Sequence, residues 1–541
     1  MSFFKKLFGS GGDEPLGPPS MPWDQRPSIY DHIQSHTVAG RPGLTKGGET
    51  LPDEARVNDD SKFRWAAGAL DGVMGHHMGE GDHDELVHKA IDLVLDYCER
   101  PTARTKAALY HHVIESQTLP LIDPIIEALV ENDRLDHERL YDLAFSFVKE
   151  AADREPVKFG IAILSLYRNP ENETLFQTLG RHEEFTLYCA VALANLNDEP
   201  EQSLWTLARN VDGWGRIHVV ERLAGTENAE IKDWLLREGY RNCVMYEYLA
   251  YTCATTGGLL SALSEDIVDR ELLTAAGEIL SALIVGGPAE NMDDYDDGAL
   301  AVELFLGHLE SSAATLDDFI HVHAIKQFLD DDKADWGCRA EQGWTRERRT
   351  ELRATCDRIL GRPEWSDLAR HGLASDDDME FHRANRVAEA IGFETWDYHW
   401  ERLQAKPTDS SRWYQVMSRC DQGRIADVIA FAEQNIDLEK IATGPADEMG
   451  IGRGWEHHQC LDYVLQELGK FAGCGNRLIR AGLRSPVVRN RNFALRAMSA
   501  WGHDRWDDDL RGALEAALRI EPEEDVRERM KTVLRGARLR D

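Results

Sequence analysis

Imidazole and carboxylate side chains of the kind that hold metal ions gather in one glycine-rich segment, Gly72–Glu85. Divalent transition metals are held in proteins by such nitrogen and oxygen ligands. The H-E-x-x-H spacing is absent here, and ligands that follow one another in a loop do not define a preformed site. A polar loop between helices is therefore the favoured interpretation. A metal site is the alternative, with these candidate ligands: His76, His77, Asp82 and His83.

A second segment rich in glycine and polar residues runs from Thr443 to His458. Gly450, Gly452 and Gly454 give the pattern G-x-G-x-G, but no strand is predicted before it, so a dinucleotide-binding loop is not expected. Long loops more often bind than catalyse. We therefore consider a polar binding site here. The other interpretation is a structured turn whose carboxylates cap helices. The candidate binding residues are Asp447, Glu448, His457 and His458.

The remaining patterns carry no catalytic signature. The acidic loop Asp293–Gly298 resembles a calcium-binding loop, but Tyr295 stands at its third position and Leu304 replaces the glutamate required at its twelfth. We therefore expect a solvated turn. The sequence contains no G-x-S-x-G motif and no Walker loop. We predict no cofactor and no catalytic residue, so binding is favoured over catalysis.

The composition is that of a folded, strongly acidic protein. Of the 541 residues, 42% are hydrophobic and 29% are charged, and the net charge is −35 at pH 7. No apolar run approaches the ~20 residues that cross a bilayer, so no transmembrane helix is expected. The nine cysteines form no C-x-x-C pair, which predicts free thiols in a reducing compartment. No signal peptide is recognised, and we expect a cytoplasmic protein.

The charge is unevenly distributed along the chain. From Arg477 onward there are 15 Lys and Arg against 11 Asp and Glu, so this end carries +4. The acidic remainder argues against nucleic-acid binding, which depends on neutralising phosphates with Lys and Arg. One interpretation of this basic end is arginines at helix ends and in surface ion pairs. The other is that the basic end is a docking surface for an acidic partner.

Hydrophobic periodicity divides the chain into five segments. Residues 1–9 form a short amphipathic element, which is suited to weak contact with a membrane surface or a partner. Residues 10–60 are rich in proline and glycine and are predicted to be a flexible linker. Two helical regions follow, 61–285 and 299–541, separated by an acidic loop at 286–298. Almost no strand pattern is found, so the predicted fold class is all-α.

Three helical segments of the first region begin 29 residues apart, at Phe185, Trp214 and Cys243. Each has small or apolar residues on one face. A helical unit that cannot bury its own apolar face must stack on its neighbours. The predicted architecture is therefore an elongated α-solenoid of stacked helical hairpins with irregular repeats.

The cleanest units lie near the C-terminus. In the segment Arg484–Met498, a loop proline is followed two residues later by Val488, then by Arg489, and then by alanine and leucine at helical spacing. This segment resembles the HEAT/armadillo-like family of helical repeats, and the segments 521–530 and 169–196 are similar to it in part. The resemblance implies a right-handed stack of helix pairs that serves as scaffold or binding surface, and no particular chemistry. The last predicted helices are 476–483, 487–501, 505–519 and 525–534.

In the HEAT-like register Val488 and Leu495 face the core, seven residues apart. Arg489 and Arg496 each follow by one position, so they lie together on one flank of the helix. Guanidinium groups held on a helix suit an acidic docking partner, and we predict these two arginines as binding residues. The alternative is local ion pairing with the carboxylates of the next unit, Asp507, Asp508 and Asp509.

The patterns together predict a helical-repeat scaffold or adaptor that binds another protein, of unknown identity, and has no catalytic activity of its own. An enzyme that uses a His- and Asp-rich loop, with a metal or as acid and base, is the first alternative. The second alternative is nucleic-acid binding through the C-terminal arginines, namely Arg480, Arg484, Arg489, Arg491 and Arg496.

Overall fold

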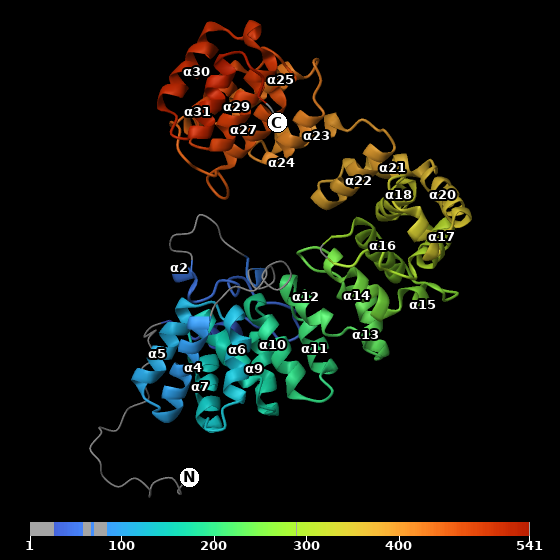
Figure 1. Ribbon diagram of the computed structural model, residues 1–541. Coiled ribbons are helices and arrows are strands. Elements are labelled where there is room, and N and C mark those ends of the chain that lie inside the picture. Colours follow the sequence, from blue (N-terminus) through green and yellow to red (C-terminus); the bar gives the residue numbers. More distant parts are fainter. Residues whose placement is uncertain (1–25, 58–65, 70–83, 288, 540–541) are drawn as a thin grey trace, which may run out of the picture. The chain divides into compact units, whose positions relative to one another are not determined.

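The structure, a computed structural model, describes residues 26–57, 66–69, 84–287 and 289–539. Within these ranges the chain folds into helices joined by turns, and the one strand-like pairing is an isolated bridge between Glu448 and Val487. The predicted all-α fold is therefore confirmed (Figure 1). None of the described helices is both long and apolar enough to cross a membrane. The amphipathic element predicted at 1–9 lies outside the described residues.

Two compact units divide between Arg362 and Pro363. Unit 1 contains α1 to α20 and unit 2 contains α21 to α31. The division thus differs from the boundary expected at the acidic loop 286–298, which lies within unit 1. There Asp293 accepts two hydrogen bonds from Arg339, at 2.6 and 2.9 Å. An ion pair with Arg339 therefore fastens this acidic loop to α19, and the Asp293 side chain stays 49% exposed.

Unit 1 is built from short and medium helices with polar caps. Thr102 and Thr315 each begin a helix with a reciprocal side-chain cap, and Asp136 and Asp269 cap two others with a carboxylate. The bounds are α1 Ile29–Ser35, α2 Glu54–Val57, α4 Asp84–Glu99, α5 Ala103–Glu115, α6 Leu119–Val130, α7 His137–Glu150, α8 Arg154–Leu164, η1 Pro170–Asn172, α9 Glu173–Leu179, α10 Glu183–Leu196, α11 Glu201–Ala208, α12 Gly213–Glu221, α13 Ala229–Trp234, η2 Leu235–Gly239, α14 Glu247–Gly257, α15 Leu259–Leu263, α16 Arg270–Val285, α17 Gly298–Ser312, α18 Leu316–Asp330, α19 Trp336–Glu341 and α20 Arg346–Leu360.

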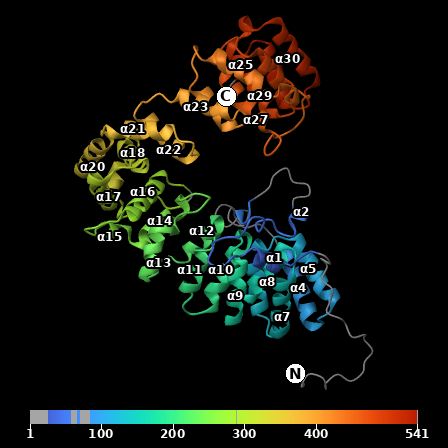
Figure 2. The ribbon, with the colours of Figure 1, turned by 180° about the vertical axis from the view of Figure 1, so that it is seen from behind.

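Seven helices of unit 1 pack side by side in a row, each against the next but one along the chain (Figure 2). The row runs α8, α10, α12, α14, α16, α18, α20. The intervening helices α9, α11, α13, α15 and α17 each contact a member of the row. The segments that begin at Phe185 and Trp214 are α10 and α12 of this row. The third segment becomes helical only at Glu247, four residues after Cys243.

Residues 26–57, which fall in the expected linker, are instead a folded part of unit 1. Helix α1 packs on α7 and α9, and its Ile29 and Ile33 are fully buried. The backbone N–H of Ile29 donates to Ala151 O at 2.8 Å. Proline and glycine here mark turns between packed residues, so composition alone gave the wrong expectation for this part. The rest of the 10–60 segment lies outside the described residues.

A buried carboxylate fastens this N-terminal segment to the helices. Asp153, whose side chain is 2% exposed, accepts hydrogen bonds from Arg26 and Arg56 at 3.0 Å and from Tyr110 at 2.5 Å. Burial opposes ionisation, but the hydrogen bonds from Arg26 and Tyr110 outweigh it and lower the pKa of Asp153. The carboxylate is therefore charged and fully engaged.

A neighbouring cluster joins α8 to α10. Arg154 pairs with Asp53 of the N-terminal segment at 3.0 Å and with Glu184 at 3.5 Å, and Lys158 pairs with Glu184 at 2.7 Å. Burial opposes ionisation of Glu184, but the charges of Lys158 and Arg154 lower its pKa to about 2. In both clusters, opposite charges thus stabilise the ionised form of a buried carboxylate.

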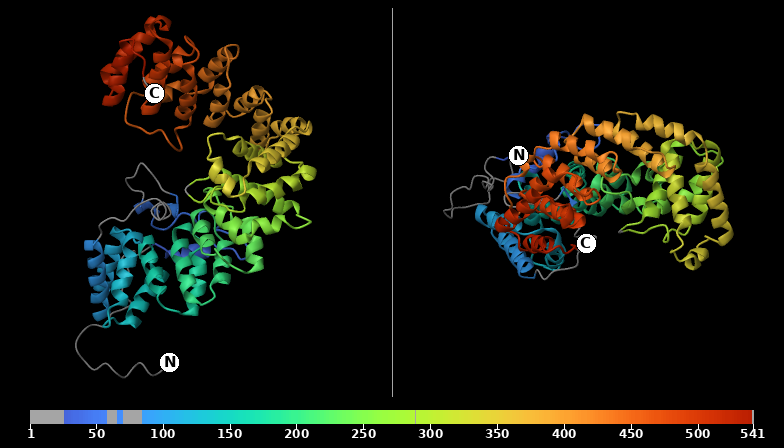
Figure 3. Two further views of the ribbon diagram at one scale, coloured as in Figure 1. Left: turned by 45° about the vertical axis from the view of Figure 1, so that its right-hand side comes forward. Right: turned by 90° about the horizontal axis from the view of Figure 1, so that it is seen from above.

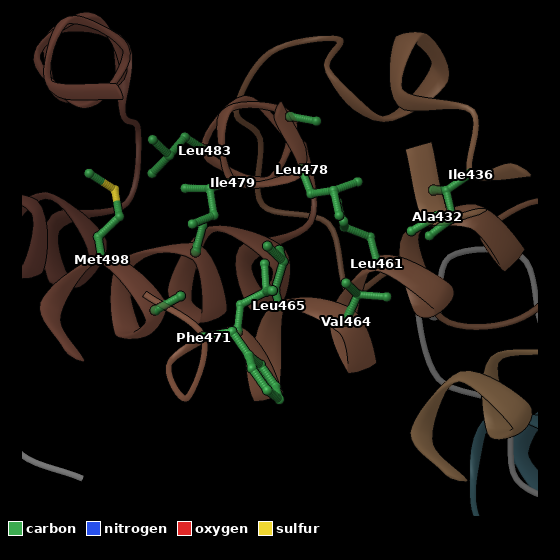
Figure 4. Packing of buried hydrophobic residues seen from close by; sticks show 14 of the residues in the cluster. Ala432, Ile436, Leu461, Val464, Leu465, Phe471, Leu478, Ile479, Leu483 and Met498 are labelled. Atoms are coloured by element: carbon green, nitrogen blue, oxygen red, sulfur yellow. The ribbon is translucent and has the colours of Figure 1, made fainter. Parts of the chain in front are cut away.

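Unit 2 contains two rows of helices; its chain is drawn in orange to red in Figure 3. One row runs α24, α27, α29, α31, and the other runs α26, α28, α30. The helix bounds are α21 Glu364–Leu373, α22 Asp378–Ala390, α23 Trp396–Ala405, α24 Ser410–Ser418, α25 Ile425–Asn435, α26 Leu438–Ile441, α27 Glu456–Leu468, α28 Asn476–Leu483, α29 Val488–Trp501, η3 His503–Arg505, α30 Asp508–Ile520 and α31 Glu524–Leu534. The core between the rows is apolar (Figure 4) and includes Leu461, Leu465, Leu478, Leu483 and Met498, all fully buried.

Replacing the buried carboxylate in Asp153→Ala should lower the free energy of unfolding by roughly 3 kcal/mol, because Tyr110 and two guanidinium groups lose their shared acceptor. The matched control is Asp198→Ala, which removes an ion pair with Arg168 between side chains that are 86% and 66% exposed. That change should alter stability by less than about 1 kcal/mol. Urea denaturation followed by circular dichroism measures both, and equal stabilities of the two variants would contradict the role given to Asp153.

Candidate functional site

An open groove of about 690 Å³ lies on α26, α28 and α30 of unit 2. Its floor is made of small residues, and we call the whole site the arginine groove because three arginines of or next to α28 line it. The floor and the apolar ends consist of Ala442, Ala481, Ala513, Ala516, Ala517, Leu438 and Ile520, and the polar lining consists of Arg477, Arg480, Arg484 and Glu439.

Helical spacing places the three arginines together. Arg477, Arg480 and Arg484 stand at positions i, i+3 and i+7, which share one face of a helix. The other face of α28 carries Leu478 and Leu483, which are fully buried in the core. The same amphipathic pattern that buries α28 therefore directs the arginines away from the core.

Most of the alanine floor of the groove comes from α30. Ala513, Ala516, Ala517 and Ile520 stand at positions i, i+3, i+4 and i+7 of this helix, so they form one stripe. The alanines present little side-chain bulk, which lets another backbone approach closely. Ile520 is 59% exposed, so the groove offers a large apolar contact at this end that the described residues do not cover.

The charges of the arginine groove are only partly compensated. Arg480 lies 3.3 Å from Asp509, whose side chain is 83% exposed, and Arg477 lies 3.9 Å from Glu433. The guanidinium of Arg484 is exposed and bonds to no group in the described part of the chain. Exposed ion pairs of this kind are weak. All three guanidinium groups are therefore accessible to a carboxylate or phosphate from outside.

Of the two arginines predicted for docking, Arg489 has a structural partner. Its Nε donates to Asp462 at 2.7 Å, and Asn490 Nδ2 donates to the same carboxylate at 2.6 Å. Burial raises the pKa of Asp462, and the hydrogen bond from Arg489 counteracts that rise. The partner is on α27, not among the carboxylates at 507–509. Arg496 lies exposed seven residues later on α29.

Arg491 is also structural. Its side chain and that of Glu521 are both 0% exposed, and Arg491 Nη2 donates to Glu521 at 3.0 Å. Arg491 Nη1 donates to three backbone carbonyls, including that of Ala446 at 2.9 Å. Among the arginines considered for nucleic-acid binding, Arg480 and Arg484 line the arginine groove, whereas Arg489 and Arg491 hold buried carboxylates.

The polar residues expected to form a site in the glycine-rich loop have separate structural environments. The backbone of Glu448 pairs with the α28–α29 turn, where its N–H donates to Pro486 O at 3.2 Å. His457 Nδ1 accepts from Asp437 N at 3.2 Å. His458 is buried against Trp455, with ring centroids 4.7 Å apart. The neighbouring Asp447 belongs to the same loop, which therefore acts as a structured turn at these positions.

Backbone contacts connect this loop to the arginine groove. The N–H of Gly444 donates to the carbonyl of Arg484 at 2.9 Å. Gly450, with φ +67°, lies against Val487, and a Cβ there would lie 2.6 Å from Val487 Cγ2. The loop is thus fastened to the turn that carries Arg484. No described histidine, cysteine or acidic residues group in threes as metal ligands do, and His76, His77, Asp82 and His83 lie outside the described residues.

Replacing a partnerless buried histidine in His458→Leu should stabilise unit 2 by about 1 kcal/mol, because both ring nitrogens are buried and bond to no described group. Burial and the charge of His457 lower the pKa of His458. His458 therefore takes up a proton more readily in the unfolded chain than in the folded protein. The wild-type protein consequently loses stability as the pH falls below about 6.5. The stabilisation by His458→Leu should be larger at pH 5 than at pH 8.

The matched control is His503→Leu, which removes a histidine whose Nε2 bonds to Val533 O at 2.9 Å. This variant should be destabilised, since it removes the side-chain hydrogen bond to Val533 O and leaves that carbonyl only backbone donors, such as the N–H of Gly536 at 3.0 Å. Thermal denaturation at the two pH values measures both changes. A loss of stability in His458→Leu at both pH values would show that the ring has a partner that stabilises it.

Comparison with known proteins assigns the chain to no family. The sequence matches no protein-family model, and no curated protein matches it significantly. What the protein does is therefore argued from the geometry of its described residues.

Proposed function

We propose that this chain is a helical-repeat scaffold that binds an acidic helical segment of a partner protein in the arginine groove. The observation that carries the proposal is the combination of three accessible guanidinium groups with a floor of alanines. Guanidinium groups bind carboxylates through two parallel hydrogen bonds, which gives strength and orientation. The proposal assigns binding, not catalysis, to this surface.

The stacking of alternate helices supports the scaffold part of the proposal. In each unit, helices pack on the next but one along the chain, as they do when hairpins stack. The proposed architecture is a HEAT-like α-solenoid with irregular repeats, acting in the cytoplasm. In such an architecture the outer faces of one row are free to present a continuous surface. Helices α26, α28 and α30 form such a row, and the arginine groove lies on it.

The dimensions of the groove favour a helix as the occupant. From Arg477 to Arg484 the chain advances seven residues, or about 10 Å along a helix at 1.5 Å per residue. Two carboxylates at i and i+7 of a partner helix have the same separation. The alanine stripe of α30 has the same period, so an apolar or small face of the partner can lie against it. This arrangement corresponds to recognition of an amphipathic helix in a groove.

Several features favour an acidic protein segment over nucleic acid. Phosphate chains require a broad basic surface, whereas this chain carries a net charge of −35. Glu439 and Asp509 lie at the groove, where they repel a continuous phosphate backbone. The apolar floor has no counterpart in a phosphate backbone. A partner helix with alternating acidic and apolar positions fits both parts of the lining.

Reversing two groove charges in Arg480→Glu plus Arg484→Glu should weaken partner binding at least about tenfold, because each lost charge-assisted hydrogen bond is worth about 1.5–3 kcal/mol. The protein is used at full length to recover partners from native lysate, which are identified by mass spectrometry and then measured individually. The melting temperature should stay near that of the wild type, since neither side chain is buried in the core.

The matched control for this variant is Arg370→Glu plus Arg386→Glu, two exposed arginines on α21 and α22 that do not line the groove. It makes the same change of charge and should leave the affinity within about twofold. A partner that binds both double variants equally well does not use the groove. Tighter binding to a DNA duplex than to any acidic protein segment would favour the nucleic-acid alternative.

Partner binding should also weaken as salt is added. The Debye length falls from about 10 Å at 0.1 M to about 3 Å at 1 M ionic strength, which screens exposed guanidinium–carboxylate attraction. The affinity of the wild type should fall over this range, and that of the Arg480→Glu plus Arg484→Glu variant should change less. Titration calorimetry at the two salt concentrations measures the difference. A binding constant insensitive to salt would mean that apolar contact alone drives association.

A further inference from the structure

A second concave site, of about 270 Å³, lies on α22, α23 and α24 of unit 2 and is separate from the arginine groove. We call it the His399 pocket. Its lining combines two imidazoles, two guanidinium groups, two carboxylates and an aromatic ring, contributed by His382, His399, Arg402, Arg412, Asp378, Asp409 and Phe381. Pockets for drug-sized ligands measure about 300–1,000 Å³, so this volume suits a smaller molecule.

A chain of hydrogen bonds sets the tautomer of His399. Asn385 Nδ2 donates to Glu389 Oε1 at 3.1 Å, and a carboxylate can only accept. The amide oxygen of Asn385 therefore faces His399 Nε2, 2.8 Å away, and accepts its proton. The proton of the neutral ring thus sits on Nε2. The lone pair is left on Nδ1, which bonds to none of the described residues.

His399 is neutral at physiological pH. The residue is 5% exposed, and its burial, together with the charge of Arg419, lowers its pKa to about 4. A ring that is neutral and held by Asn385 offers Nδ1 as a hydrogen-bond acceptor of fixed direction. The pocket therefore contains a nine-tenths-buried polar side chain with one atom that lacks a partner in the described chain.

Two guanidinium groups line the same pocket and are held by backbone carbonyls. Arg402 Nη1 donates to Ser375 O at 2.8 Å, and Arg412 Nη1 donates to Arg402 O at 2.5 Å. The carbon of the Arg402 guanidinium also lies 4.1 Å from the centre of the Phe381 ring. Both arginine side chains are only 17% exposed. Their positions are thus fixed by the protein rather than by solvent.

The carboxylate that these arginines share is a surface group. Asp378 pairs with Arg402, and its Oδ1 lies 3.3 Å from Arg412 Nη2. Asp378 is the first residue of α22, and its side chain is 73% exposed. An exposed carboxylate contributes little to such a pair and can turn toward water. The contact places one carboxylate oxygen beside both guanidinium groups.

We propose that the His399 pocket binds a small carboxylate that carries a hydroxyl or amino group on the adjacent carbon. The ligand's carboxylate takes the place of Asp378 between Arg402 and Arg412, and its O–H or N–H donates to His399 Nδ1. Phe381 closes the apolar side of the pocket. This function goes beyond partner binding in the arginine groove and does not depend on it.

The test is titration calorimetry of the full-length protein with matched pairs of probes. Glycolate, L-lactate and L-malate carry the donor, and acetate, propionate and succinate are their counterparts without it. At least one donor-bearing probe should bind with a dissociation constant of millimolar or below, and about fivefold or more tightly than its counterpart. If no probe binds, or if the members of every pair bind equally, the proposal is overturned.

Substitutions of pocket residues, measured with the same probes, test whether the binding occurs in this pocket. His399→Phe should abolish the preference for the donor-bearing probe while its counterpart still binds. Arg412→Met should weaken both probes about tenfold. Asp378→Asn should tighten binding about threefold, because it removes the carboxylate that contacts both arginines, whereas Asp409 pairs with only one of them, Arg412, at 3.4 Å. A merely structural role of Asp378 does not produce this outcome.

The control for these variants is Arg370→Met. Arg370 is an exposed residue of α21 in the same unit and lines neither the pocket nor the arginine groove, so this change should leave binding unchanged. If His399→Phe or Arg412→Met fails to fold, the probe pairs and Asp378→Asn still decide the question. Weaker binding in Asp378→Asn, or equal weakening by Arg370→Met, would overturn the proposed site.

Discussion

A helix with one apolar face is stable in water only when that face is covered. In this protein the cover comes from consecutive helices, such as α7 and α8, and along the rows mostly from the next helix but one. The row from α8 to α20 and the two rows of unit 2 repeat this contact. This packing buries the apolar surface of the helices within each row and leaves the charged residues on the outside. A strongly acidic chain can therefore remain folded, because its many carboxylates stay in water or meet an opposite charge.

Buried carboxylates divide the arginines of the chain into two classes. Some, such as Arg491 beside Glu521 and Arg489 beside Asp462, neutralise a charge that folding has removed from water. Others, such as Arg484, face outward and bond to nothing else in the described chain. Arginines of the second class, and those whose partner is an exposed carboxylate, such as Arg480 beside Asp509, are available to a ligand. The arginine groove is basic because such arginines lie in α28 or directly after it, on the face opposite to its buried leucines.

Periodicity predicted the existence and type of many helices. The segment 476–483 coincides with α28, whereas the helix expected at 505–519 begins at Asp508, because Asp507 caps it by accepting from Leu510 N at 2.6 Å. Composition failed for residues 26–57, since burial of Ile29 depends on distant helices. The i, i+3, i+7 spacing of Arg477, Arg480 and Arg484 was visible, but the alanine floor comes from α30. No local pattern could separate Arg489 from Arg484, because Asp462 lies 27 residues away.

The most direct test of the central claim is hydrogen–deuterium exchange of the full-length protein with and without an acidic helical partner segment bound. Peptides that cover α26, α28 and α30 should exchange more slowly in the complex, and the rest of unit 2 should change little, because only that row carries the arginine groove. Protection confined to other helices, or no protection in a complex known to have formed, would contradict the account.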